Sequence, residues 1–239
     1  MRIRTALAIA ALAASATIAL AGCAQLEPVG PPVPTAESTS SPEPSADPAA
    51  AWLDDGRGIG LVTYGSSSLA CTPVVQDVDA DGQTIRVTLA EPDPNVACTA
   101  DFAPRATFVG VPEGVDPTKD VTVSFDGGGF RGRLPLAGDS ALGAGAAGDG
   151  KPSAGWFSDN GILLLTWGSS TCRPVVSDLV ENQDKKGATV TFQTDATQVC
   201  TMDFVPRITV LGVEAPADPA GYSLTLKGDH LDGQVTVIG

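Results

Sequence analysis

Histidine is nearly missing from this 239-residue chain: it occurs once, as His230, and only 5% of the residues are aromatic. A serine nucleophile needs a neighbouring base, most often histidine, and zinc sites draw on histidine and closely paired cysteines. No two cysteines here are spaced as C-x-x-C. The composition therefore predicts a protein that is not an enzyme and that uses no cofactor.

Basic residues are also few, with 14 lysines and arginines against 28 aspartates and glutamates, a formal net charge of −14. Nucleic acids and anionic lipid headgroups are bound by positively charged surfaces. We therefore expect neither of them as a main partner, and an acidic surface that favours solubility.

Long apolar runs are missing except at the N-terminus, where two arginines precede an alanine-rich stretch over residues 6–21. This layout is typical of an export signal. The sequence LAGC at Leu20–Cys23 resembles the lipobox of bacterial lipoproteins. That resemblance implies that residues 1–22 are removed and that Cys23 carries lipid such as palmitate, which would hold the protein on the extracytoplasmic face of the cell membrane.

The segment over residues 23–51 is rich in Pro, Ser, Thr, Ala and acidic residues, and it lacks the large apolar side chains that build a core. Such a composition predicts a disordered tether. Beyond it the chain repeats itself at 52–137 and 155–239, and a Gly- and Ala-rich linker at 138–154 separates the two copies. For example, CTADFAPRATFVGV in the first copy corresponds to CTMDFVPRITVLGV in the second.

Both copies are predicted to be all-β, because short runs of Val, Ile, Leu and Thr alternate with turns rich in Gly, Asp and Pro. We expect two tandem small β-sandwich or barrel-like domains. Trp52 and Trp156 should close the edge of each core, and Phe102 and Phe204 should lie inside it. The expected strands lie near residues 59–64, 73–78, 83–90, 105–111, 121–125 and 130–136, and near 161–167, 174–180, 187–194, 207–213, 222–227 and 231–237.

Four cysteines remain beside Cys23, two in each copy at matching positions. In an exported protein such a pattern favours disulfides. Because each copy should be self-sufficient, we expect one bond within each, Cys71–Cys98 and Cys172–Cys200. On the chain-entropy estimate each bond contributes about 3–4 kcal/mol of stability.

A glycine and a run of hydroxyls precede the first cysteine of each copy, as GSSS at Gly65 and GSST at Gly168. These are not the G-x-S-x-G elbow of a serine hydrolase, and the first copy has no histidine at all. We expect a tight turn whose hydroxyls bind backbone groups. The first copy also carries two extra residues here, Leu69 and Ala70.

The sequence DVDADG in the first copy spaces Asp77, Asp79 and Asp81 like the start of a calcium loop. The acidic residue expected at the twelfth position is replaced by Thr88, and the second copy lacks the pattern. A β-hairpin turn through Asp81 and Gly82 explains the same residues without a metal. The calcium candidate is therefore weak.

Two kinds of residue are candidates for binding. Arg105 and Arg207 belong to an Asp-Phe-x-Pro-Arg element in each copy, where the arginine either pairs with the aspartate across a turn or binds an anion. Tyr64 and Trp167 directly precede the Gly-Ser-Ser turns and could either stack on a ligand or pack in the core.

The mature region resembles uncharacterised surface lipoproteins of high-GC Gram-positive bacteria, which carry the same Gly-Ser-Ser…Cys and Cys-Thr-x-Asp-x-x-Pro-Arg elements. This resemblance implies location and architecture rather than a reaction. We expect a lipid-anchored cell-envelope protein that serves as a non-enzymatic binding or structural module for an envelope protein or glycan. The alternatives are an envelope enzyme or enzyme accessory that acts on glycan or peptide, and a calcium-stabilised adhesion module.

Overall fold

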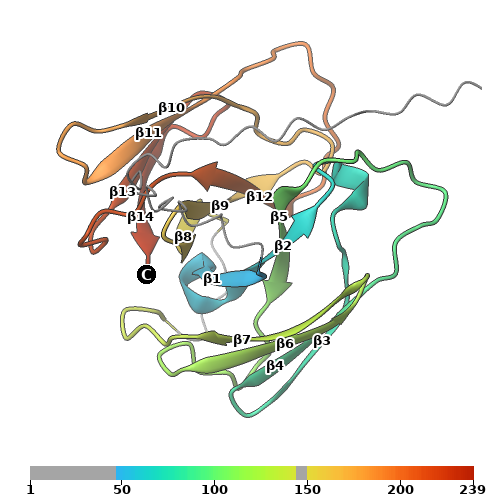
Figure 1. Cartoon of the computed structure of the whole chain (residues 1–239). Coiled ribbons are helices and arrows are strands. Elements are labelled where there is room, and N and C mark those ends of the chain that lie inside the picture. Colours follow the sequence, from blue (N-terminus) through green and yellow to red (C-terminus); the bar gives the residue numbers. More distant parts are fainter. Residues whose placement is uncertain (1–46, 144–149) are drawn as a thin grey trace, which may run out of the picture. The chain divides into compact units, whose positions relative to one another are not determined.

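The computed structural model describes residues 47–143 and 150–239 (Figure 1). The predicted signal peptide, Cys23 and most of the predicted tether lie outside these residues, as does the middle of the linker. Within the described ranges, no helix is long and apolar enough to cross a membrane. The chain is all-β there apart from two three-residue 3₁₀ turns, Asp54–Gly56 and Leu69–Cys71.

Each repeat forms seven strands in the same order, and six of them in each copy match the predicted ones. The strands of repeat 1 are β1 (Ala49–Leu53), β2 (Gly58–Gly65), β3 (Val75–Asp81), β4 (Thr84–Leu89), β5 (Ala103–Gly110), β6 (Val121–Gly127) and β7 (Phe130–Leu136). Those of repeat 2 are β8 (Ser153–Ser158), β9 (Gly161–Gly168), β10 (Val176–Glu181), β11 (Gly187–Phe192), β12 (Val205–Gly212), β13 (Ser223–Lys227) and β14 (Gly233–Ile238). The sequence did not predict β1 and β8, which begin inside the segments expected to be tether and linker.

The strands of repeat 1 form two sheets, β1-β2-β5 and β3-β4-β6-β7. In the second sheet β4 and β6 run parallel, while the other pairs are antiparallel. Repeat 2 has the same two sets of strands, but parallel pairing of β14 with β8 joins them into one seven-stranded sheet. The fold therefore preserves the duplication seen in the sequence, with one difference in how the sheets connect.

Each repeat encloses its own hydrophobic core between these two sets of strands. In β4, for example, Ile85, Val87 and Leu89 are buried while the two residues between them are exposed, the alternation of a strand with one face on a core. Trp52 and Trp156 pack on the cores of repeat 1 and repeat 2, as predicted. The prediction of an all-β chain with two β-domains is confirmed.

The inner strands are buried on both faces, because the two repeats pack against each other. On β9, Ile162 and Leu164 belong to the core of repeat 2, whereas Leu163 and Leu165 join a third cluster with Ala51 and other residues of repeat 1. At Gly60 on β2, an added Cβ would lie only 2.2 Å from a Leu163 methyl group. The two domains predicted from the repeat therefore share an interface.

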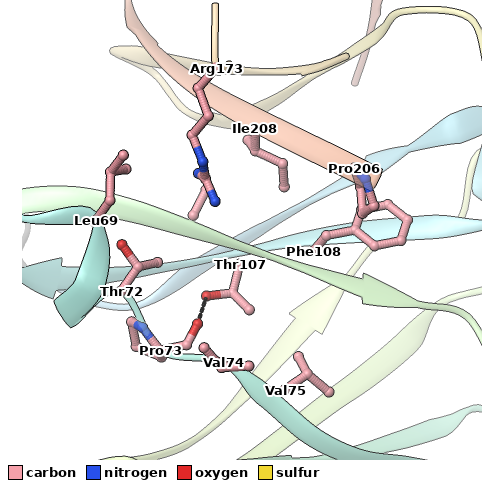
Figure 2. Close-up of a pocket in the computed structure, with 11 residues that line it drawn as sticks. Leu69, Thr72, Pro73, Val74, Val75, Thr107, Phe108, Arg173, Pro206 and Ile208 are labelled. Carbon is pink, nitrogen blue, oxygen red and sulfur yellow. Dashed lines mark hydrogen bonds between the residues drawn. The ribbon is translucent and has the colours of Figure 1, made fainter. Parts of the chain in front are cut away.

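A groove of about 310 Å³ lies beside this interface (Figure 2). Strands β5 and β12 supply one side of it, and the loops that follow β2 and β9 supply the rest. Residues of both repeats therefore line this one groove.

Candidate functional site

The two predicted disulfides are present, Cys71–Cys98 with a Cα–Cα distance of 5.9 Å and Cys172–Cys200 with 5.5 Å. Each joins the loop after the second strand of its repeat to the segment that enters the fifth strand. We call these two paired segments the disulfide loops: residues 66–74 with 96–102 in repeat 1, and 169–175 with 198–204 in repeat 2. The duplication had predicted this pairing, and it is confirmed.

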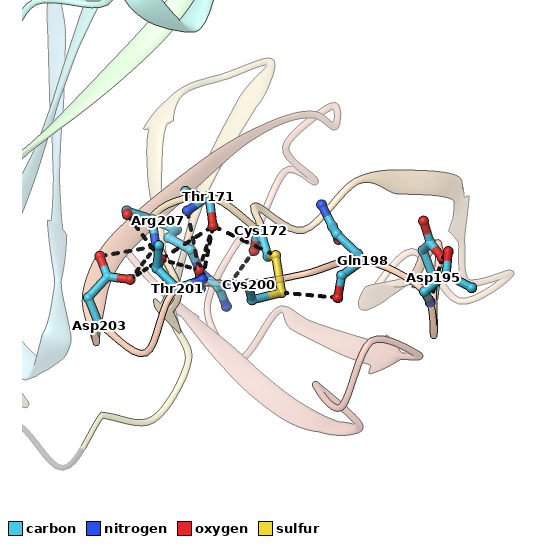
Figure 3. The surroundings of a disulfide bond; sticks show 11 residues. Thr171, Cys172, Asp195, Gln198, Cys200, Thr201, Asp203 and Arg207 are labelled. Carbon is cyan, nitrogen blue, oxygen red and sulfur yellow. Dashed lines mark hydrogen bonds between the residues drawn. A yellow bond between two sulfur atoms is a disulfide. The ribbon is translucent and has the colours of Figure 1, made fainter.

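In repeat 2 the carboxylate of an aspartate accepts a hydrogen bond from the backbone of the disulfide loop (Figure 3). Asp203 accepts the N–H of Ser170 at 3.2 Å and the hydroxyl of Thr201. Hydrogen bonds from the hydroxyls of Thr201 and Ser170, and from the Ser170 N–H, lower the pKa of Asp203 to about 2. The carboxylate is therefore ionised throughout the physiological range and fixes the turn.

An arginine holds the same loop by hydrogen bonds to its backbone carbonyl oxygens. Arg207 donates from Nη1 to the carbonyl oxygen of Cys172 at 2.6 Å and from Nη2 to that of Trp167 at 3.0 Å. Its side chain leaves too little room for a Cβ at Gly168, which would come within 2.8 Å of the guanidinium carbon. The glycine of the Gly-Ser-Ser element is needed to admit the arginine, as well as to turn the chain.

Repeat 1 has the same arrangement. Asp101 accepts the Ser67 N–H at 3.0 Å, and Arg105 donates to the carbonyl oxygen of Cys71 at 2.6 Å. Hydrogen bonds from the hydroxyls of Ser67 and Thr99, and from the Ser67 N–H, lower the pKa of Asp101 to about 2. The aspartate and the arginine thus bind the loop at two different points in each repeat.

This geometry gives the two arginines, predicted as binding candidates, a structural role in the disulfide loops. Arg105 and Arg207 are only 9% and 8% exposed, and burial lowers the pKa of each. In each arginine the Nη donors bond to loop carbonyl oxygens, while the buried Nε has no hydrogen-bond partner within the described residues. The pairing of each arginine with its aspartate, considered from the sequence, is replaced by these bonds to the backbone.

The hydroxyls of the Gly-Ser-Ser elements form part of the same network. Ser66 and Thr99 share a hydrogen bond of 2.7 Å, as do Ser169 and Thr201. The Ser66 hydroxyl also accepts the N–H of Ser68 at 3.2 Å. The bond from the Ser68 N–H matches the expectation that the hydroxyls bind backbone groups, whereas the bonds between hydroxyls were not predicted.

The second pair of candidates, Tyr64 and Trp167, lies in stacked aromatic pairs. Tyr64 stacks on Phe102 with ring centroids 5.7 Å apart, and Trp167 stacks on Phe204 at 5.8 Å. Tyr64 and Trp167 are half-buried, but Phe102 and Phe204 are 67% and 66% exposed. We call these the aromatic stacks.

The expectation that Phe102 and Phe204 lie in the core is therefore wrong. Strands β5 and β12 begin one residue later, so each phenylalanine still belongs to a disulfide loop beyond the end of the sheet. There it covers the half-buried ring of its neighbour and leaves its own outer face in solvent. The sequence pattern alone does not show where the strand begins.

Other apolar side chains gather on the same loops. Of the eight large hydrophobic residues exposed within the described ranges, only Val180 lies elsewhere. Beside the two phenylalanines, the disulfide loops carry Leu69 (62% exposed), Val74 (64%), Val175 (52%), Val199 (92%) and Met202 (103%). Clustered exposed apolar surface of this kind is typical of interaction sites.

The calcium candidates occupy an exposed strand. Asp79 and Asp81 form ion pairs with Arg86 at 2.9 and 3.0 Å, and Asp77 lies on the same strand, β3. Asp81 pairs with Thr84 across a tight hairpin turn in which Gly82 has a φ of +57°, the alternative predicted from the sequence. Within residues 47–143 and 150–239, no group of three or more His, Cys, Asp and Glu residues is placed to hold a metal.

No family model matches this chain, and no curated protein or solved structure matches it either. The site is therefore interpreted from its own geometry. That geometry is a duplicated β-domain in which a braced disulfide loop presents an exposed aromatic stack.

Proposed function

We propose that this protein is a lipid-anchored, non-enzymatic binding module of the cell envelope, and that the aromatic stacks bind a glycan. The observation that carries the proposal is the exposure of Phe102 and Phe204, each stacked on a second ring in a loop that is otherwise fully braced. Leaving a large aromatic side chain in water forfeits about 1.5–3 kcal/mol of burial. The same exposed arrangement occurs in both repeats.

The bracing supports a role in binding. Each disulfide loop is held by a covalent bond, by the aspartate at its backbone N–H and by the arginine at its carbonyl oxygens. Rings fixed in this way lose little conformational entropy when a ligand arrives. A flat, preformed aromatic surface suits the apolar face of a sugar ring, and two copies suit a polymer of repeating sugars.

The lipid anchor predicted at Cys23 would place the module where such polymers lie. The acidic composition fits a neutral or hydroxyl-rich ligand better than a polyanion. An envelope protein is the competing partner.

The proposal can be tested by retention of the full-length chain on purified envelope glycan. Phe102→Ala and Phe204→Ala should each weaken retention by about tenfold, since one aromatic contact contributes on the order of 1.5 kcal/mol. The double variant should lose more than either single one because the two sites act on one polymer. Val180→Ala, which removes an exposed apolar side chain outside the disulfide loops, is the matched control. Unchanged retention by the double variant, or capture of proteins but no glycan, would overturn the proposal.

A further inference from the structure

Besides the change from Ser68 to Thr171, the two repeats differ at two places in their shared Gly-Ser-Ser…Cys-x-Pro-Val-Val element, and residues from both places line the groove beside the repeat interface. The first is the insertion in repeat 1 that supplies Leu69. The second is the residue after the cysteine, which is Thr72 in repeat 1 and Arg173 in repeat 2. All three side chains line the groove, together with apolar residues of β5 and β12 (Figure 2).

Arg173 is the one charged residue that lines this groove. Its guanidinium extends between Leu69 and Ile208 (Figure 2). Within the described residues, no ion pair or hydrogen bond engages it. Arg173 is exposed to solvent, and no aspartate or glutamate lines the groove beside it.

Arg207, which lies between Pro206 and Ile208 on β12 but does not line the groove, interacts electrostatically with Arg173. Burial lowers the pKa of Arg207, Asp229 partly offsets this, and the like charge of Arg173 lowers it further. Arg173 therefore acts on Arg207 as a like charge, and Asp229 acts as an opposite one. An anion that binds Arg173 would relieve this repulsion.

The walls of the groove are apolar and fixed. Phe108, Pro206 and Ile208 line one side. The loop of repeat 1 forms the other side, and it is held against β5 because Thr107 donates from its hydroxyl to the carbonyl oxygen of Pro73 at 2.7 Å. The volume of about 310 Å³ is at the lower end of the range of about 300–1,000 Å³ for small-ligand pockets.

We propose that this groove binds a small anionic saccharide, a sugar that carries a carboxylate or a phosphate, with the anionic group on Arg173. Arginine presents a planar fork of donors that matches both groups. The Thr72 hydroxyl is placed for a sugar hydroxyl, and the apolar wall is placed for the C–H face of the ring. The site shares no residue with the aromatic stacks, so it is separate from the glycan site proposed above.

The test is an NMR titration of the full-length chain with four probes: glucuronic acid, glucose 6-phosphate, glucose and inorganic phosphate. We expect saturable shifts at Thr72 and Phe108 with one or both anionic sugars, and binding of glucose at least tenfold weaker. The comparison of glucuronic acid with glucose 6-phosphate identifies whether the anionic group is a carboxylate or a phosphate. Arg173→Thr should weaken binding at least tenfold. This variant carries the residue that repeat 1 has at the same place, so its loop is expected to fold.

Arg133→Thr, which removes an exposed arginine on β7, controls for the change in net charge and should leave binding unchanged. Equal binding of glucose and the anionic sugars, or unchanged binding in Arg173→Thr, would overturn the proposal. If inorganic phosphate bound as tightly as glucose 6-phosphate, the groove would hold an adventitious ion only. The Phe102→Ala, Phe204→Ala double variant should still bind the anionic sugars in the groove. A failure of the groove proposal can therefore be distinguished from a failure of the proposal that the aromatic stacks bind a glycan.

Discussion

Arg207 illustrates how single residues hold this fold together. Its two Nη groups donate to the carbonyl oxygens of Cys172, in the disulfide loop, and of Trp167, near the end of β9. A buried charge is costly unless it is bonded in this way. Arg207 therefore connects the disulfide loop at Cys172 to the end of β9 at Trp167, which is also a member of the aromatic stack.

Replacing Arg207 by methionine should destabilise the protein. Methionine fills similar space but leaves two carbonyl oxygens without their charged donor, and we expect a loss of about 2–4 kcal/mol in the free energy of unfolding. Urea denaturation measures it. Arg133→Met, at an exposed position on β7, should change the free energy by less than about 0.5 kcal/mol. Equal effects of the two substitutions would contradict the role assigned to Arg207.

Acid should loosen both disulfide loops. The pKa values of Asp101 and Asp203 are about 2 in the folded protein against an ordinary 3.8, so these carboxylates stabilise the fold above pH 3.8. That contribution is lost as the pH falls toward 2. The Asp101→Asn, Asp203→Asn variant should melt below the unmodified protein at pH 7 and approach it near pH 2. If the difference in melting temperature between the two proteins stayed the same from pH 7 to pH 2, the carboxylates would not be responsible for the loss of stability in acid.

Among the elements, β1 and β8 set how closely the repeats approach. An added Cβ at Gly155 on β8 would lie 2.3 Å from the carbonyl oxygen of Trp52 on β1. The Ser153 hydroxyl accepts the N–H of Asp54 at 2.6 Å, so the end of β1 is also bonded to the start of repeat 2. These contacts leave no space for a side chain between the two backbones.

The substitution Gly155→Ala should therefore weaken the contact between the repeats. Because the obstacle is backbone rather than a flexible side chain, we expect a loss of about 1–3 kcal/mol in the free energy of unfolding. Gly110→Ala on β5 is the matched control, since an added Cβ there meets nothing within 4 Å. A Gly155→Ala protein as stable as the control would show that β1 and β8 can separate without cost.

The strands that the sequence predicted are those with one buried face. β4 alternates Ile85, Val87 and Leu89 with polar residues, and such a pattern identifies a strand without further information. β1 could not be predicted in this way, because it starts with three alanines, continues the composition of the segment before it, and is packed on both the core of repeat 1 and the cluster between the repeats. Phe102 was misplaced for a related reason, since only the observed start of β5 separates it from the core.

The candidate site, like the fold, could be predicted only in part from the sequence. The disulfides, and Tyr64 as a candidate, followed from matching positions in the two copies. The stacking of Tyr64 on Phe102 depends on the disulfide loop folding back over the end of β2, and no local pattern encodes that contact. The groove around Arg173 depends on how the repeats pack, which one copy alone does not determine.

At the scale of the whole described unit, the shared cluster makes the two repeats interdependent. Leu163 is fully buried against repeat 1 although it belongs to repeat 2. We expect the chain to unfold in one transition that involves both repeats. Leu163→Ala should lower the free energy of unfolding by about 2–5 kcal/mol, and both repeats should still unfold together. Denaturation followed by hydrogen exchange in each repeat measures this, and a loss of protection confined to repeat 2 would show that the domains fold separately.

The position of β1 also has a mechanical consequence. If the chain is held at Cys23, as we propose, β1 is the first strand of the described residues to receive a pull from the membrane. That strand is paired to β2 through five residue pairs and contributes to both the core of repeat 1 and the cluster between the repeats. Tension would therefore act first on a strand that both repeats share, so that release of β1 would open the core of repeat 1 and the cluster between the repeats together.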